Sequence, residues 1–241
     1  MTQVFVTERY GNRFIIKGDD YHHIARVRRV KINDIINVRD PEGALVRARV
    51  TRIDAAELEA IPLEEKSPGE GAGGISLILA VAVLKGKKFD FVIQKATEAG
   101  VDQIIPVITE RTVPDISGKA EPRLHRWNRI AEEASKQCMK GRVTAVGPFE
   151  SFNEYTSRQH SGAKLLAHPD SATPLSEYHR CTAEVSCINL LVGPEGGFSS
   201  AEVDRARASG WTPVRVGSTV FRAETAAVVI PSIVLYEWSR G

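Results

Sequence analysis

The alternation of apolar and polar residues changes character on either side of residues 67–74. Before them, short runs alternate apolar and polar positions between turn residues, in FVTERY, RFIIKG, DIINVRD and ALVRARVTRI. Period-two alternation is typical of strands that bury one face, so this part predicts a small β domain, a barrel being one possible arrangement, with one short helix around HHIARVRRV. Residues 67–74, SPGEGAGG, carry no apolar side chain larger than alanine and predict a linker.

Beyond the linker, apolar strands alternate with amphipathic helices. The predicted strands are ISLILAVAVL, QIIPVIT, AKLLAH, CINLLVG and PVRVG. The first predicted helix lies in KKFDFVIQKATEAG and stops at Gly100, and Pro122 opens the second. The third begins after Ser199, which forms a capping box with Glu202, and ends at Gly210. The last runs from about Ala223 to Trp238 and contains Pro231. This alternation implies a mostly parallel sheet covered on both faces. We therefore expect an α/β domain over residues 75–241, preceded by a small β domain over residues 1–70.

Charge and cysteine content narrow the choice of partners. The formal net charge is only +2, but Lys and Arg outnumber Asp and Glu in residues 1–53 and again in residues 85–142. Two basic regions fit a surface that contacts a polyanion, and an ordinary solvated surface is the alternative. Cys138, Cys181 and Cys187 form no C-x-x-C pair, which argues against a disulfide framework or a structural zinc site. The N-terminus lacks a secretory apolar region and no apolar run is long enough to span a bilayer, so we expect a cytoplasmic protein with no membrane and no metal partner.

A glycine-rich turn ends one predicted strand. Residues 191–198 read LVGPEGGF, and ligands of open parallel sheets bind outside the carboxyl ends of strands. The chain has neither G-x-G-x-x-G after a strand nor a Walker loop, which makes a nicotinamide oxidoreductase remote. The glycines allow backbone groups to approach a flat ligand, although an ordinary tight connection would also explain them.

A second loop, VRVGSTVFRAETAAV, also leaves a strand and enters a helix. Arg222 and Glu224 lie at the start of that helix. Glutamate is stabilised by the helix dipole at this end, whereas arginine is not, so Arg222 suggests an anionic partner. A surface salt bridge between Arg222 and Glu224 is an equally good explanation of the residue types alone.

Together the two loops resemble the SPOUT methyltransferases, specifically the RsmE-like family that methylates uracil N3 in small-subunit ribosomal RNA. That family has a strand ending in hGPEGGh, where h is apolar, and a loop of the form hGxxhLRxETA; here they read LVGPEGGF and VGSTVFRAETA. The likeness extends to HHIARVRRVK, LKGKKFDFVIQKATEAGV, RWNRIAEEASKQC and LLAHPD, in the family's order along nearly the whole chain. Phe221 where the family has leucine, Thr219 where it often has a basic residue, and Pro231 inside the last helix depart from the pattern.

The resemblance implies a fold and a cofactor. It implies a trefoil-knotted SPOUT domain after a PUA-like β-barrel, S-adenosylmethionine bound in the knot, and a homodimer. The residues that it assigns to the cofactor are Leu166, Ala167, His168, Val192, Gly193, Pro194, Glu195, Gly196, Gly197, Val216, Gly217, Val220, Phe221, Ala223, Thr225 and Ala226. Glu195 either contacts the cationic amino-acid end of the cofactor or is purely structural.

The resemblance also implies catalytic and RNA-binding residues. Arg222 is expected to stabilise negative charge on the uracil as N3 loses its proton, and Glu224 to orient Arg222 or to take the proton. The predicted contacts to ribosomal RNA are Arg26, Arg28, Arg29, Lys85, Lys87, Lys88 and Arg142. His22 and His23 are expected to pack inside the small domain. A SPOUT enzyme acting on transfer RNA or on a ribose 2′-oxygen, and a non-catalytic RNA-binding assembly factor, are the alternatives.

Overall fold

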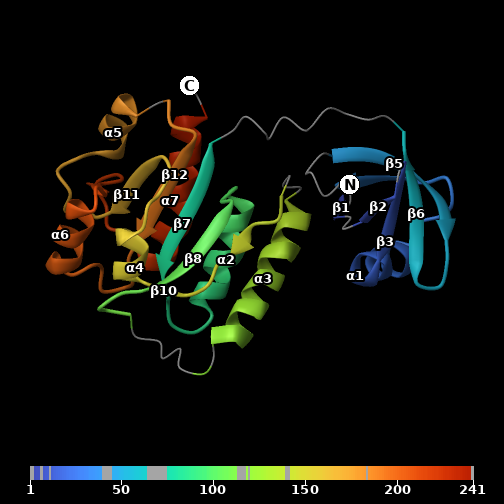
Figure 1. Cartoon of the computed structure of the whole chain (residues 1–241), viewed down its shortest axis with the longest axis horizontal. Helices are drawn as coiled ribbons and strands as arrows, with labels where there is room; N and C mark the ends of the chain where they lie inside the picture. Colours follow the sequence, from blue (N-terminus) through green and yellow to red (C-terminus); the bar gives the residue numbers. More distant parts are fainter. Residues whose placement is uncertain are drawn as a thin grey trace. The chain divides into compact units, whose positions relative to one another are not determined.

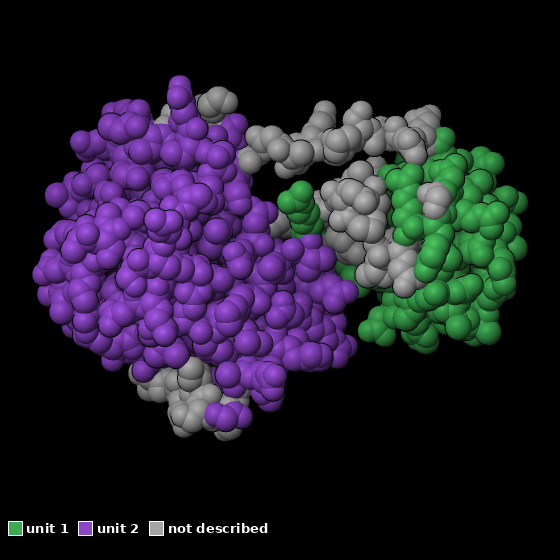
Figure 2. Space-filling model, in the orientation of Figure 1, with its two compact units in different colours: residues 1–73, 135–142 green, residues 74–134, 143–241 purple. Residues whose placement is uncertain are grey.

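The computed structural model describes residues 3–5, 8–10, 12–39, 45–63, 75–112, 118, 120–138, 142–182 and 184–239. The chain divides into two compact units (Figure 1, Figure 2), of which unit 1 comprises Met1–Gly73 with Ser135–Arg142, and unit 2 comprises Gly74–Ala134 with Val143–Gly241. The predicted linker at residues 67–74 lies entirely outside the described residues. Among the described residues, no helix is both long and apolar enough to cross a membrane.

Unit 1 is built on one six-stranded sheet. Its strands are β1 (Gln3–Phe5), β2 (Glu8–Tyr10), β3 (Arg13–Lys17), β4 (Ile35–Arg39), β5 (Leu45–Ile53) and β6 (Glu57–Pro62), in the order β1-β4-β5-β6-β3-β2. All of its strand pairs are antiparallel except β1 with β4. In β3 the buried Phe14 and Ile16 alternate with residues that are more exposed, which confirms the period-two prediction. The predicted single strand FVTERY is divided into β1 and β2, and β6 was not predicted.

The short helix of unit 1 differs from its prediction. It begins earlier, as α1 (Gly18–Tyr21), and continues as the π-helical turn η1 (His22–Val27). Tyr21 and Ile24, three residues apart, are both buried. His22 and His23 fall on the other side of the turn and are exposed, so the expectation that they pack in the core is wrong.

Unit 2 contains a sheet in which every strand pair is parallel. Its strands are β7 (Ser76–Ala82), β8 (Gln103–Ile108), β9 (Ala145–Val146), β10 (Glu150–Ser151), β11 (Ala163–Ala167), β12 (Cys187–Val192) and β13 (Thr212–Val214). The order is β10-β8-β7-β12-β11-β13, with β9 also paired to β8. The parallel arrangement confirms the prediction from alternating strands and helices.

Helices cover both faces of this sheet. They are α2 (Lys88–Glu98), α3 (Ala120–Gln137), α4 (Phe152–Ser157), α5 (Leu175–Cys181), α6 (Ser200–Ala208) and α7 (Ala223–Trp238). Leu79 and Val81 of β7 join the core cluster that includes α2, α3, α5 and α7, whereas Ala80 joins the cluster that includes α4 and α6. The bounds of α7 match the prediction, and so does the capping box of α6, in which Ser199 and Glu202 each bind the other's backbone N–H. The short α4 and α5 were not predicted.

The strand order fixes where loops gather. Strands β7, β12, β11 and β13 are consecutive neighbours and run in the same direction, so their carboxyl ends lie at one edge of the sheet. The segments that follow them are residues 83–87, 193–199, 168–174 and 215–222. Both glycine loops singled out from the sequence are among these four segments.

Candidate active site

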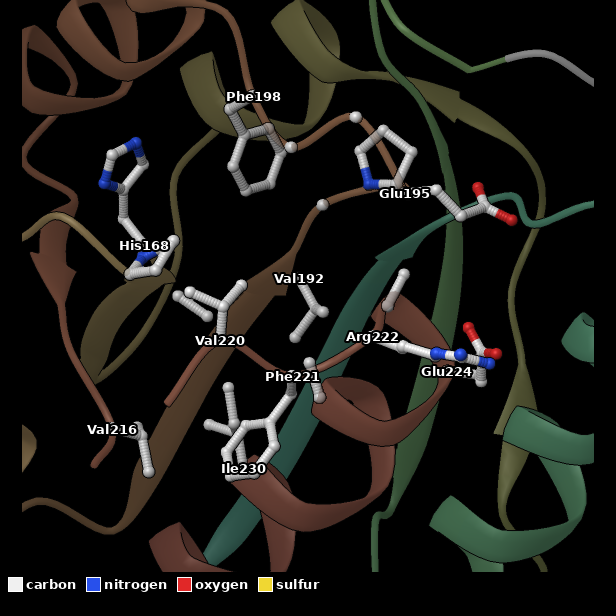
Figure 3. A pocket seen from close by; sticks show the side chains of 18 of the residues that line it. His168, Val192, Glu195, Phe198, Val216, Val220, Phe221, Arg222, Glu224 and Ile230 are labelled. Carbon is white, nitrogen blue, oxygen red and sulfur yellow. The ribbon is translucent and has the colours of Figure 1, made fainter. Parts of the chain in front are cut away.

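A cavity of about 580 Å³ opens at this edge of the sheet (Figure 3). Its lining comes from the ends of β11, β12 and β13 with the segments that follow them, and from the first half of α7. The start of α2 and the segment after β8 add one residue each. The volume lies within the range typical of small-molecule sites in proteins. Two loops about 25 residues apart in the chain therefore converge on one cavity.

The glycine loop owes its shape to its glycines. The N–H of Gly197 donates to the carbonyl of Pro194 at 2.9 Å, and Gly197 has φ +67°, a left-handed conformation that favours glycine. A Cβ at Gly193 would lie 3.2 Å from the ring of Phe198, tighter than ordinary packing. The loop thus folds back on itself closely and presents backbone, rather than side chains, to the cavity.

The middle of the cavity is apolar. Val192 and Ile230 are almost fully buried in its floor, and Figure 3 shows them beside Val220 and Phe221. Val220 has 76% of its surface exposed, the largest value among the exposed large apolar residues in the described part of the chain. An apolar wall of this kind suits a flat aromatic ligand.

Charged side chains gather at one end of the cavity, opposite His168 (Figure 3). Lys88 Nζ lies 3.2 Å from Glu195 Oε1 and 3.3 Å from Glu224 Oε2, so one ammonium joins three segments. The hydrogen bond to Glu195 raises the pKa of Lys88, with a smaller contribution from Glu224 and against partial desolvation. The pKa of Glu224 is lowered, first by a hydrogen bond from its own backbone N–H and then by Lys88 and Arg222. Both Lys88 and Glu224 are therefore charged at neutral pH.

One oxygen at this end retains hydrogen-bonding capacity. Glu224 Oε2 is buried and accepts no hydrogen bond of good geometry from the described residues, although Lys88 Nζ is 3.3 Å away. A buried acceptor without a well-aimed donor is costly unless a ligand supplies one. This oxygen is shielded from solvent, and the Lys88 ammonium holds it by charge rather than through an aligned hydrogen bond.

Arg222 is the N-cap residue of α7 and is exposed. It makes no ion pair within the described part of the chain, where Glu224 pairs with Lys88 instead. The predicted alternative of an Arg222–Glu224 salt bridge is therefore not formed among these residues. The guanidinium remains available for an anionic partner.

Contacts from the end of β8 hold the glycine loop in place. Arg111 Nη1 donates to the carbonyl of Gly196 at 2.6 Å. The backbone N–H of Glu110 donates to Glu202 Oε1 at 2.9 Å, and Arg205 donates to Glu110 at 2.5 Å. These bonds connect the segment after β8 with the loop after β12 and with α6.

The structure brings together most of the predicted site residues. Arg222 and Glu224 line the cavity, as do all the predicted cofactor residues except Leu166, Gly217 and Thr225. Leu166 is fully buried in the core, and the other two are exposed. Of the predicted RNA contacts, Lys88 lies in the cavity, and the remaining ones, all exposed, are Arg26, Arg28, Arg29, Lys85, Lys87 and Arg142.

Sequence reasoning missed several lining residues. These are Arg111, Pro169, Asp170, Phe198, Val214, Thr219 and Ile230. Phe198 and Thr219 lie within the two quoted motifs and could have been included on that ground. Arg111 follows β8, which is not a neighbour of β12, so no local pattern indicated it.

Within the described residues, no group of three or more His, Cys, Asp and Glu side chains is arranged to hold a metal ion.

Comparison with known families gives two matches that together span most of the chain. Residues 74–235 match the model of an RNA methyltransferase domain, and residues 16–63 match that of an RNA methyltransferase PUA domain.

Curated relatives carry one common name. A ribosomal RNA small subunit methyltransferase E from Mesomycoplasma hyopneumoniae is 29% identical over 95% of this chain and 97% of its own length. The protein of the same name from Synechocystis is 30% identical over 86% of this chain and 68% of its own length. Among solved structures, that of the Neisseria gonorrhoeae protein of this name bound to S-adenosyl methionine superposes with a TM-score of 0.85 at 28% identity, covering 99% of this chain and 98% of the other.

Proposed function

The chain belongs to the RNA methyltransferase domain family, and from that membership we propose that it uses S-adenosylmethionine to methylate N3 of one uridine in small-subunit ribosomal RNA. It is an RNA-methylating enzyme of the kind that its relatives are named for. Their common name favours ribosomal RNA over transfer RNA as the substrate.

The observation that carries the proposal is the convergence of the two motif loops on one cavity. LVGPEGGF supplies its backbone wall, and VGSTVFRAETA supplies Arg222 and Glu224 at the charged end. A cofactor site and a pair of groups suited to uracil are thereby adjacent. This arrangement also argues against a non-catalytic assembly factor, because such a protein needs neither a cofactor site nor groups that act on uracil.

The cavity fits the cofactor in size and in chemistry. Its apolar middle, around Val192 and Phe221, suits adenine, and the backbone of Gly193–Gly197 can approach closely. The carboxylate of Asp170 suits a ligand that carries positive charge. When bound, S-adenosylmethionine supplies an activated methyl group on a positively charged sulfur. The chain's own task is then to position the base and to manage the N3 proton.

Arg222 and Glu224 are proposed to perform that task. The guanidinium of Arg222, which makes no ion pair with the described residues, stabilises negative charge on a uracil carbonyl oxygen as N3 loses its proton. The carboxylate of Glu224, which lines the cavity and is held by Lys88, accepts a hydrogen bond from N3–H and so fixes the orientation of the base. Its lowered pKa makes it a weak base, which favours orientation over full removal of the proton.

Further parts of the proposal follow from the family resemblance. They are a trefoil knot around the cofactor loops, a homodimer, a cytoplasmic location, and RNA contacts from the exposed Arg26, Arg28 and Arg29 of unit 1. Contacts to phosphates predict an RNA affinity that falls steeply with salt concentration.

Mass spectrometry of ribosomal RNA tests the proposal directly. Small-subunit RNA from cells that lack the protein should lose one methyl group on the base of a single uridine, and purified protein with S-adenosylmethionine should restore it. Unchanged small-subunit RNA, or loss of a methyl from transfer RNA or a ribose, would contradict the proposal.

A further inference from the structure

Lys88 occupies a position that its residue type alone disfavours. It is the first residue of α2, where the positive end of the helix dipole opposes a cation. The chain reaches this position from β7 through Gly86, which has φ +60°. Because β7 is the neighbour of β12 in the sheet, the start of α2 lies beside the glycine loop.

Two carboxylates compensate for this placement. Glu195 of the glycine loop and Glu224 of α7 both face the Lys88 ammonium, at 3.2 and 3.3 Å. Without Lys88, two negative groups would line the end of the cavity at which the proposed reaction develops negative charge on the base. One of them, Glu224, would then have Arg222 as the nearest available cation.

We propose that Lys88 is a positioning residue for methyl transfer, which holds Glu195 and Glu224 as its own counter-ions and thereby leaves Arg222 free to face the substrate base. The inference rests on the proposed function and goes beyond it, because it gives Lys88 a role in the rate of the reaction and not in RNA binding. Three segments far apart in sequence depend on this one side chain for their charge balance.

The two roles for Lys88 predict opposite kinetic effects. If Lys88 positions the carboxylates, Lys88→Met lowers kcat by about 10- to 100-fold, because Arg222 is drawn toward Glu224, and changes the KM for RNA by less than about threefold. If Lys88 instead contacts a phosphate, the same substitution raises the KM for RNA, reduces the salt dependence of binding by about one charge, and leaves kcat unchanged.

Lys95 provides a matched control on the same helix. Its side chain is 37% exposed and pairs with Glu98 at 2.8 Å, whereas that of Lys88 is 41% exposed. Lys95→Met therefore removes an equally exposed lysine ion pair from α2 at a position that does not line the cavity, and should leave kcat and KM within about twofold of the wild type.

The experiment measures kcat and the KM for small-subunit RNA in wild type, Lys88→Met, Lys88→Arg and Lys95→Met, with the affinity for S-adenosylmethionine from calorimetry. We expect a loss of kcat in Lys88→Met only, with most of it restored by Lys88→Arg, which keeps the charge. A kcat of Lys88→Met within about twofold of the wild type, or a change confined to the KM for RNA, overturns the role of Lys88 while the proposed function stands. A wild-type protein that binds the cofactor but methylates no small-subunit RNA overturns the proposed function and, with it, this role.

Discussion

Replacement of Glu202 by alanine should destabilise unit 2 strongly although the residue lies outside the cavity. Glu202 is fully buried and accepts two backbone hydrogen bonds, from Ser199 at 2.8 Å and from Glu110 at 2.9 Å. The first closes the capping box of α6, and the second ties the end of β8 to that helix. Alanine would leave both backbone donors without this acceptor.

The expected loss can be estimated from the two bonds. A hydrogen bond to a charged group contributes about 1.5–3 kcal/mol, so loss of both lowers the free energy of unfolding by about 4 kcal/mol. For a chain of this size, that corresponds to a fall in Tm of roughly 12 °C. Glu202→Gln should lose less, because its amide oxygen can still accept one of the two hydrogen bonds.

Glu154 is the matched control. It completes the same kind of capping box with Ser151 at the start of α4, but it is exposed, and within the described part of the chain it accepts from one backbone donor. Water can satisfy the donors there, so Glu154→Ala should have a much smaller effect.

Tryptophan fluorescence is the appropriate assay because Trp127, Trp211 and Trp238, the three tryptophans of the chain, all lie in unit 2. Thermal melts then report unfolding of that unit alone. A Tm for Glu202→Ala within about 3 °C of the wild type, or an equal loss in Glu154→Ala, would refute the reasoning.

Three further predictions concern the site and the backbone. Arg222→Ala should lower kcat by about 10²- to 10³-fold with unchanged cofactor affinity in calorimetry, and normal turnover would exclude its electrostatic role. Gly162→Ala should destabilise the protein far more than Gly86→Ala in chemical denaturation, because both have positive φ but only at Gly162 would a Cβ meet a carbonyl oxygen, that of Cys187, at 2.0 Å. The pKa of Glu224 in the folded protein is lowered from its ordinary value of 4.5. The stability that the ionised carboxylate contributes is therefore fully present above pH 4.5, and it is lost only as the pH falls through the lower folded-state pKa. The pH profile of kcat should therefore show no Glu224 ionisation between about pH 6 and pH 9, and an acidic limb near neutrality that disappears in Glu224→Gln would contradict this.

The strongly periodic elements could be predicted from the sequence because their signals are local. The spacing of Phe89, Val92, Ile93 and Ala96 predicted α2, and all four are buried on one face. The six residues of α4 are too few to establish a period, so that helix was missed. The parallel sheet followed from the alternation of strands and helices, whereas its strand order did not, because hydrophobic periodicity contains no information on which strands are neighbours.

The residues of the candidate site also differ in whether a local sequence signal indicates them. Glycines and a helix-terminal arginine could be recognised within single segments, and the family resemblance joined those segments into one site. The partner of Lys88 could not be recognised, because Glu195 is 107 residues away and meets it only through the pairing of β7 with β12. Residue type alone does not distinguish Lys88 from Lys85 and Lys87, which are exposed, and a phosphate contact stays a prediction for all three.

The charges at the end of the cavity explain why a cation begins each of two helices there. Lys88 begins α2 and Arg222 caps α7, both against the local helix dipole. Glu195 and Glu224 both pair with Lys88, so the carboxylates that could compensate Arg222 are already engaged. The four side chains sum to zero charge, yet among the described residues Arg222 is the member of this cluster without an ion pair. A neutral cluster of this kind would not draw RNA phosphates into the cavity, but it would stabilise an anion that forms beside Arg222 during the reaction. Under the proposed function, this geometry would separate attraction of the RNA, for which we propose the exposed arginines of unit 1, from stabilisation of the reacting base.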